Sequence, residues 1–286
     1  MILLRPLLLL AFLTSALQAE TPAETARRLF EAKRYPEARV VIEKIAAAEP
    51  NNAEAQFYLG VLAEMRGDLD EAVAHLERAT ALTPANSNYV LELGGAYGQA
   101  AQKAGLFSKF GLAKKCQAAL EKAVALDPDN LDARNGLLSY YRQAPSIIGG
   151  GIAKAYEQAA EIRKRDPLMG ANVLGQIYLD DKKPDEAFAL YEATLRTAPD
   201  DYGLLYAIGR AAAQTGQHLD RGEQTLRRCL TLTPPARQPG PAAVNWRLGN
   251  IAEKRGDPAA ARAAYHVALQ LDPTFKLAAD SLAKLK

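Results

Sequence analysis

The sequence is poor in the residues that bind metals or cross-link chains. Among its 286 residues there are only two cysteines, Cys116 and Cys229, and three histidines, His75, His218 and His266. Two cysteines cannot form a disulfide framework, and the histidines do not have the short spacing of metal ligands. We therefore predict that both cysteines are small core residues, and that the protein uses no metal and no cofactor.

Catalytic motifs are also absent from the sequence. It contains no Gly-x-Ser-x-Gly motif and no phosphate-binding loop that ends in Lys-Ser or Lys-Thr. Adjacent carboxylates such as Asp180-Asp181 and Asp200-Asp201 fall at expected turns, where capping explains them better than acid–base chemistry. The formal net charge of +2 is far from the basic excess of a nucleic-acid-binding protein. The sequence therefore argues against an enzyme and against a nucleic-acid partner.

The first 19 residues differ in composition from the rest of the chain. Arg5 precedes an apolar stretch from Leu7 to Leu13, and small residues surround Ala16 and Ala19. This is the layout of a secretory signal peptide, and the apolar stretch is well short of the roughly 20 residues that a membrane span needs. We predict that residues 1–19 are a signal peptide cleaved after Ala19, with cleavage after Ala16 as the alternative. The mature protein would then be periplasmic or secreted.

What the sequence does contain is a repeat, marked by a recurring proline. Each of these prolines follows a stretch that is rich in alanine and leucine and has helical periodicity. Successive prolines are 32 to 44 residues apart, and the positions are Pro50, Pro84, Pro128, Pro167, Pro199, Pro234 and Pro273. A self-similar unit of about 34 residues is typical of a helical solenoid, which usually works as a binding surface.

Each unit reads as two helices. In residues 53–86, Leu59-Gly60 begins the contact stripe of a first helix and Gly67-Asp68 interrupts it. A second stripe then runs to Pro84, which stops the helix because proline lacks an N–H and clashes with the preceding turn. We therefore expect a chain of antiparallel helix hairpins.

These units resemble the tetratricopeptide repeat, whose pattern runs Leu-Gly-x-x-Tyr, then Ala-x-x-x-Phe, then Pro. Leu93-Gly94 with Tyr97 fits the first part, and Ala187 with Tyr191 fits the second. The resemblance implies an all-α fold, a right-handed solenoid of about seven antiparallel helix hairpins with a C-terminal capping helix. The hairpins are expected at about 20–52, 53–86, 87–130, 131–167, 168–201, 202–241 and 242–273, and the capping helix at 274–286.

In this family the first helix of each hairpin lines an inner groove. Asparagine and glutamine side chains there can both donate to and accept from a peptide backbone, and aromatic residues with arginine are the usual anchors of an interface. Trp246 is one position late relative to the family tryptophan, so we expect it to face the groove. The resemblance implies a ligand groove lined by Phe57, Tyr58, Val61, Asn88, Asn135, Arg142, Asn172, Gln176, Tyr206, Arg210, Trp246, Arg247 and Asn250.

Two units are longer than the repeat. The third carries about ten extra residues between its helices, within 100–115, and the fourth carries about five, within 144–151. Both insertions fall at the same place in the hairpin, so they should lie side by side at one edge of the solenoid. The patch that they form comprises Leu106, Phe107, Lys109, Phe110, Ile147, Ile148, Gly149, Gly150 and Gly151.

Three interpretations of this insertion-edge patch stay open. Its apolar residues could pack on one another as a local thickening of the solenoid. The lysines and apolar residues could instead contact an anionic membrane surface or a partner protein. The glycines, which precede a helix, could cradle an anion with their backbone N–H groups.

The sequence predicts a non-enzymatic scaffold or adaptor of the bacterial cell envelope, which binds an extended peptide or a helix of a partner protein in its groove. The alternative is a membrane-peripheral accessory factor that uses the Lys/Phe/Leu-rich insertion 100–115 on anionic lipid. A further alternative is a homo-oligomer in which end units stack on each other, which the mass in solution would distinguish from the scaffold, so the oligomeric state stays open.

Overall fold

The computed structural model describes residues 20–236 and 238–285, and every regular element in these ranges is helical. They hold fifteen α-helices and one short 3₁₀ turn, η1, and no strand. The expected signal peptide, residues 1–19, lies outside the described residues. The chain divides into two compact units, the first ending at Ala85 and the second beginning at Asn86.

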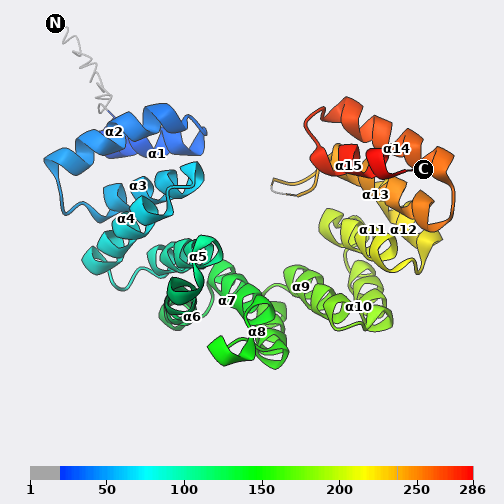
Figure 1. Cartoon of the computed structure of the whole chain (residues 1–286), viewed down its shortest axis with the longest axis horizontal. Helices are drawn as coiled ribbons and strands as arrows, with labels where there is room; N and C mark the ends of the chain where they lie inside the picture. The colour runs from blue at the N-terminus through cyan, green and yellow to red at the C-terminus, as the bar shows by residue number, and fades with distance from the viewer. Residues whose placement is uncertain (1–19, 237, 286) are drawn as a thin grey trace, which may run out of the picture. The chain divides into compact units, whose positions relative to one another are not determined.

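The first unit consists of two helix hairpins (Figure 1). Its helices are α1 (Pro22–Glu31), α2 (Tyr35–Ala48), α3 (Ala53–Arg66) and α4 (Leu69–Leu82). Each helix packs on the next one along the chain. Ile42 of α2 and Leu59 of α3 lie in the shared core, and Leu76 of α4 is fully buried.

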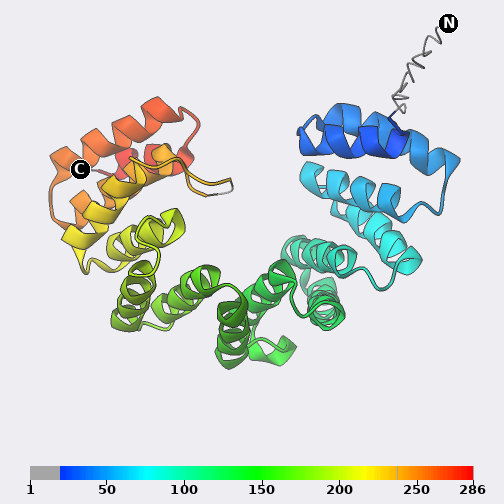
Figure 2. The same ribbon diagram turned by 180° about the vertical axis from the view of Figure 1, so that it is seen from behind.

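The second unit contains five hairpins and a closing helix, and Figure 2 shows the same succession from behind. Its first two hairpins are α5 (Ser87–Lys103) with α6 (Leu106–Leu126), and α7 (Leu131–Gln143) with α8 (Ile152–Arg165), the latter pair joined through η1 (Ser146–Ile148). The other elements are α9 (Pro167–Asp180), α10 (Pro184–Leu195), α11 (Tyr202–Thr215), α12 (Leu219–Cys229), α13 (Pro241–Lys254), α14 (Pro258–Leu271) and α15 (Lys276–Lys284). These hairpins confirm the expected all-α fold, a solenoid of helix hairpins.

Polar caps open many of the helices directly after a proline turn. The side chains of Asn86, Asn130 and Asp201 each accept a hydrogen bond from a backbone N–H in the first turn of the helix that follows. Such a cap satisfies a donor that would otherwise have no partner at the helix start. At these three boundaries the sequence therefore acts locally, by a proline that ends one helix and a cap that begins the next.

Glycines in the first helices let the two helices of a hairpin approach closely. A Cβ placed on Gly175 would lie 2.3 Å from the ring of Tyr191, and one on Gly249 would lie 2.3 Å from the ring of Tyr265. Both tyrosines are fully buried. The Leu-Gly element of the repeat therefore creates the space that the large side chain of the second helix fills.

The long third unit differs from the expectation of an inserted loop. Residues 100–103 end α5, residues 106–115 begin α6, and only Ala104 and Gly105 lie between the two helices. The expected loop at 100–115 is wrong, because the extra residues continue the helical periodicity and lengthen both helices. The insertion at 144–151 does contain a loop, and its η1 turn contacts α6, so the two insertions lie side by side as expected.

Candidate functional site

In the first unit, the expected groove residues Phe57, Tyr58 and Val61 lie on α3 and are half-buried. The Phe57 and Tyr58 rings are 5.5 Å apart, and Tyr58 also packs on Phe30 of α1 at 4.8 Å between ring centroids. These aromatic side chains thus take part in the packing of the first unit, and their contact with a ligand stays a prediction.

In the second unit, Arg142 of α7 and Gln176 of α9 meet at one carboxylate. The Arg142 guanidinium forms an ion pair with Asp180, which is the last residue of α9. Gln176, one turn earlier on α9, donates from Nε2 to Asp180 Oδ1 at 2.9 Å. Asp180 was expected to be only a turn residue, although its spacing of four from Gln176 places the two side chains on the same helix face.

A second contact joins α9 to α11. The Arg210 guanidinium of α11 donates to Asn172 Oδ1 of α9 at 3.5 Å. The Tyr191 hydroxyl lies beneath them and donates to the Asn172 backbone oxygen at 3.5 Å. Burial raises the pKa of Tyr191, and the nearby Arg210 charge opposes that rise. Arg210 is therefore held at this position by α9 and by the hairpin beneath it.

On α13, Arg247 and Asn250 are held in a similar way. The Arg247 guanidinium lies over the Trp246 ring, with its Cζ 4.1 Å from the ring centroid, and donates to Asn250 Oδ1 at 3.5 Å. Asn250 Nδ2 donates to the Tyr265 hydroxyl at 2.9 Å, and that hydroxyl in turn donates to Glu253. Burial is the main cause that raises the pKa of Tyr265, so it remains a neutral donor.

Together these contacts define one polar surface, which we call the first-helix face of the second unit. It comprises Arg142, Asn172, Gln176, Asp180, Arg210, Arg247 and Asn250. Among the first helices that carry it, α9 packs on α11 and α11 packs on α13. The Arg142–Asp180 pair links α7 to α9, so the face is continuous over four hairpins.

The three arginines of this face share an unusual feature. In each of Arg142, Arg210 and Arg247 the Nε–H is buried and has no hydrogen-bond partner. In the part of the chain that the structure describes, these three Nε atoms are the only buried side-chain nitrogen or oxygen atoms that have no hydrogen-bond partner. A buried donor without a partner costs free energy, so each of these arginines is held on the face at a cost to stability.

Trp246 itself points to the end of the repeat array. Its indole Nε1 donates to Ser281 Oγ of α15 at 3.0 Å, and its ring meets Phe275 edge to face at 5.9 Å. The side chain is half-buried, and Leu282 packs against the same small core. Trp246 therefore fastens the closing helix, and the same ring supports Arg247.

Three other expected groove residues take no part in the contacts of this face. Tyr206 is only 8% exposed and belongs to the core, because α11 is packed by α9, α10, α12 and α13. The prediction that Tyr206 anchors a ligand at the groove surface is therefore wrong. Asn88 is exposed at the start of α5 and accepts from Asn130 Nδ2 at 2.8 Å, and Asn135 is half-buried on α7.

The insertion-edge patch does not form the expected apolar thickening. Phe107 is 100% exposed and Ile147 is 82% exposed, so these side chains do not pack on each other, and that interpretation is wrong. Phe110 and Ile148, by contrast, line a common pocket together with Lys109. Leu106 is the first residue of α6.

The anion cradle at the three glycines is also wrong. The backbone N–H groups of Gly149, Gly150 and Gly151 donate to the carbonyl oxygens of Ser146, Pro145 and Tyr141, respectively. All three donors are therefore used within the chain, and none is available to an anion.

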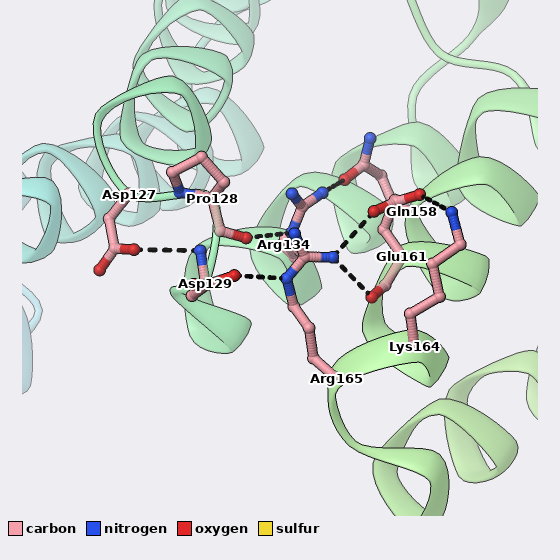
Figure 3. A network of polar contacts seen from close by, with 8 residues as sticks. All are labelled: Asp127, Pro128, Asp129, Arg134, Gln158, Glu161, Lys164 and Arg165. Atoms are coloured by element: carbon pink, nitrogen blue, oxygen red, sulfur yellow. Dashed lines mark hydrogen bonds and ion pairs between the residues drawn. The ribbon is translucent and has the colours of Figure 1, made fainter.

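A charged cluster joins the α6–α7 turn to α8 (Figure 3). Arg165 Nε donates to Asp129 Oδ1 at 2.7 Å, and its Nη1 donates to Glu161 Oε2 at 2.8 Å. Arg134, which is buried, donates from Nε to the Pro128 oxygen at 2.6 Å. Because these charges pair with one another, the cluster ties two hairpins together and has no obvious role in binding.

The described residues contain no group of His, Cys, Asp and Glu side chains that could hold a metal ion. In the same residues no helix is both long enough and apolar enough to span a bilayer. Cys116 and Cys229 are free and buried, as expected. Burial raises the pKa of Cys116 to about 11 and that of Cys229 to about 12, so neither is a reactive thiol.

The repeated helix hairpins define an α-solenoid of the kind that usually binds other proteins. Tetratricopeptide-repeat family models match residues 24–87, 149–202, 172–236 and 242–275, which is more than half of the chain. The chain therefore belongs to the tetratricopeptide repeat family. No curated protein matches it.

Several solved structures share the fold at low sequence identity. A tetratricopeptide repeat protein from Parabacteroides merdae is 14% identical, with a TM-score of 0.66 over 92% of this chain and 96% of that one. The C-terminal part of a repeat protein from Cytophaga hutchinsonii is 21% identical, with a TM-score of 0.52 over 91% and 99%. PilF from Pseudomonas aeruginosa is 16% identical, with a TM-score of 0.51 over 81% and 97%. At these identities the likeness concerns the fold alone.

Proposed function

We propose that the protein is a non-enzymatic scaffold that binds an extended, acidic segment of a partner protein along the first-helix face of the second unit. The observation that carries the proposal is the row of three half-buried arginines, Arg142, Arg210 and Arg247, on the first helices α7, α11 and α13. A carboxylate matches the planar fork of a guanidinium and can accept two N–H groups at once.

The neighbouring amides suit the backbone of such a segment. Asn172, Gln176 and Asn250 lie beside these arginines, and each amide can donate to a peptide carbonyl and accept from a peptide N–H. Arginines that are already oriented by Asn172, Asn250 and the Trp246 ring lose little freedom on binding. The face therefore combines charge recognition with sequence-tolerant backbone contacts.

Selection from a displayed random-peptide library tests this proposal. The immobilised protein should enrich peptides rich in Asp and Glu, and a variant that lacks the three guanidinium groups should lose affinity for them at least about tenfold. The test variant is Arg142→Gln/Arg210→Gln/Arg247→Gln. A matched control removes the same charge from exposed arginines of the second helices and their ends, and is Arg163→Gln/Arg196→Gln/Arg262→Gln.

Both variants remove three positive charges, so a comparison of the two distinguishes recognition by the first-helix face from general charge attraction. Loss of binding in the test variant alone supports recognition by the first-helix face. Equal loss in both variants would mean that general charge attraction brings the peptides to the protein, and no enrichment of acidic peptides would contradict the proposal.

We further propose that the scaffold acts in the cell envelope of a bacterium, as a periplasmic or secreted protein. The support is the signal-peptide layout of residues 1–19. Fractionation of the producing cells, followed by N-terminal sequencing, tests it. A mature chain that begins at Glu20 or Leu17 in the periplasm or medium agrees with the proposal, and an intact chain in the cytoplasm contradicts it.

A second candidate is a membrane-peripheral accessory factor. Phe107 and Ile147 support it, because large apolar side chains that are 100% and 82% exposed can enter a lipid surface. Flotation with anionic liposomes tests it, with Phe107→Asp/Ile147→Asp as the variant. The candidate is favoured if the wild type binds the liposomes in a salt-sensitive way and the variant does not bind. Equal flotation of the wild type and the variant contradicts it.

A further inference from the structure

A pocket of about 730 Å³ lies within the second unit, and none of the arginines of the first-helix face lines it. Its walls come from α5, α6, α7 and the segment 144–148, so both insertions contribute to it. Such a volume lies within the range of roughly 300–1,000 Å³ that small-molecule sites usually have.

The floor of the pocket is formed by glycines on one side of α5. Gly94, Gly95 and Gly98 all line it. A Cβ placed on Gly95 would meet no atom within 4 Å, so this glycine opens directly onto the empty space. Neither hairpin packing nor a turn requires glycine at position 95, since φ there is not in the left-handed region.

The end wall of the pocket is a turn that only glycine allows. A Cβ on Gly150 would lie 1.8 Å from the Ala144 carbonyl oxygen, and Gly149 has a φ of +89°. This tight reversal brings Ile148 against the pocket, where its carbonyl accepts from the Tyr140 hydroxyl at 2.6 Å. The glycine run, which does not bind an anion, therefore shapes the pocket.

The chemistry of the lining selects a ligand. Most of the lining is apolar, and its polar groups are glutamine amides, the Tyr140 hydroxyl and one ammonium group. Lys109 is the only charged lining residue, and no carboxylate lines the pocket. Phe110 beside it is 46% exposed, which places this part of α6 at the rim. An apolar ligand with a single negative charge at one end is complementary to this arrangement.

We propose that the pocket binds a free fatty acid, with its chain over the glycine floor of α5 and its carboxylate at Lys109. A partner helix laid over the same apolar lining is the competing occupant, and the test below distinguishes it. No residue of the first-helix face lines this pocket, so the ligand proposed here is distinct from the partner segment proposed above.

Isothermal titration with hexadecanoate tests the proposal, with hexadecanol as the uncharged probe of equal chain length. The variant Gly95→Phe projects a ring into the pocket and should lower the affinity for both probes at least about tenfold. The matched control is Gly111→Phe on α6, because Gly111 is exposed, lies outside the pocket and also has open space at its Cβ. Thermal melting by circular dichroism shows whether each variant is folded.

The charge is tested separately. Lys109→Gln should weaken hexadecanoate binding roughly two- to fivefold, as for a partly exposed ion pair, and leave hexadecanol binding unchanged. Lys114→Gln, at an exposed position outside the pocket, should leave both unchanged. A Lys109→Gln variant that loses both probes equally would overturn the assignment of the carboxylate to Lys109.

Each remaining outcome decides the proposal. Saturable binding of one hexadecanoate that Gly95→Phe removes and Gly111→Phe retains supports it. No binding, or equal binding by folded Gly95→Phe, overturns it. If hexadecanoate does not bind but Gly95→Phe abolishes capture of a helical peptide or of phospholipid vesicles, the pocket has a different occupant and the proposal is wrong.

Discussion

The Arg142 guanidinium of α7 forms an ion pair with the Asp180 carboxylate at the end of α9. This pair joins two successive hairpins, and it also occupies an arginine of the proposed binding face. Asp180 therefore competes with a ligand carboxylate for the Arg142 guanidinium. The side chains of Arg142 and Asp180 are 26% and 41% exposed, so the pair can open without unfolding.

We therefore predict that Asp180→Asn strengthens the binding of an acidic peptide roughly two- to fivefold, which corresponds to the loss of a partly exposed ion pair. Fluorescence anisotropy with a peptide from the display selection measures it. Asp185→Asn, at an exposed position on α10, is the matched control and should change the affinity little. Weaker binding by Asp180→Asn would mean that this carboxylate helps to hold the ligand.

A second prediction concerns the closing helix. The Trp246–Ser281 hydrogen bond joins α13 to α15, and Ser281→Ala should lower the free energy of unfolding by about 1 kcal/mol. The chain has a single tryptophan, so its fluorescence reports directly on the docking of α15. In urea, the emission of the variant should shift at a lower concentration than in the wild type. Identical emission curves would show that the bond does not stabilise α15.

A third prediction uses the close approach within the hairpins. Gly175→Ala places a Cβ 2.3 Å from the Tyr191 ring and should destabilise the protein by about 1–3 kcal/mol, as overpacked cores do. Gly95→Ala meets no atom and should stabilise it by up to about 1 kcal/mol through helix propensity. Thermal melts of the two variants should therefore shift in opposite directions. Shifts of the same sign would contradict the assigned packing.

A fourth prediction concerns acid stability at the cluster of Figure 3. Hydrogen bonds from Lys164 and Arg165 lower the pKa of Glu161 from 4.5 to about 2. Because the pKa is lower in the folded state, the carboxylate stabilises the fold above pH 4.5, and this contribution disappears as the pH falls toward 2.

The variant Glu161→Gln lacks this contribution at every pH. Its melting temperature should be below that of the wild type at pH 7, and the difference should shrink between pH 4.5 and 2. Glu157→Gln, on the exposed side of α8, is the control. A difference that stays constant over this range would show that Glu161 does not titrate as described.

Local signals in the sequence were sufficient to predict the hairpins. Proline stops, polar caps and the Leu-Gly element act within one repeat, so Gly175 against Tyr191 follows from the family pattern. Contacts between repeats depend on how neighbouring hairpins pack, and for that reason Asp180 was expected only at a turn. The burial of Tyr206 results from four helices that pack around α11. Because three of them belong to neighbouring hairpins, the pattern of a single repeat does not predict this burial.

The insertions were predicted in position but not in form. The stretch from Leu106 to Lys115 contains no proline, and it continues α6 because nothing in it stops a helix. The exposure of Phe107 and the open space at Gly95 depend on that extra helical length. A repeat pattern alone does not predict either of them, since Phe107 lies in the insertion and the space beside Gly95 depends on α6 and the segment 144–148.

Hydrogen–deuterium exchange with and without a bound acidic peptide from the display selection tests the central claim most directly. The account predicts that the peptide slows exchange in α7, α9, α11 and α13 of the second unit, and that Arg142→Gln/Arg210→Gln/Arg247→Gln abolishes this protection. Protection confined to the second helices α8, α10 and α12 would contradict binding at the first-helix face.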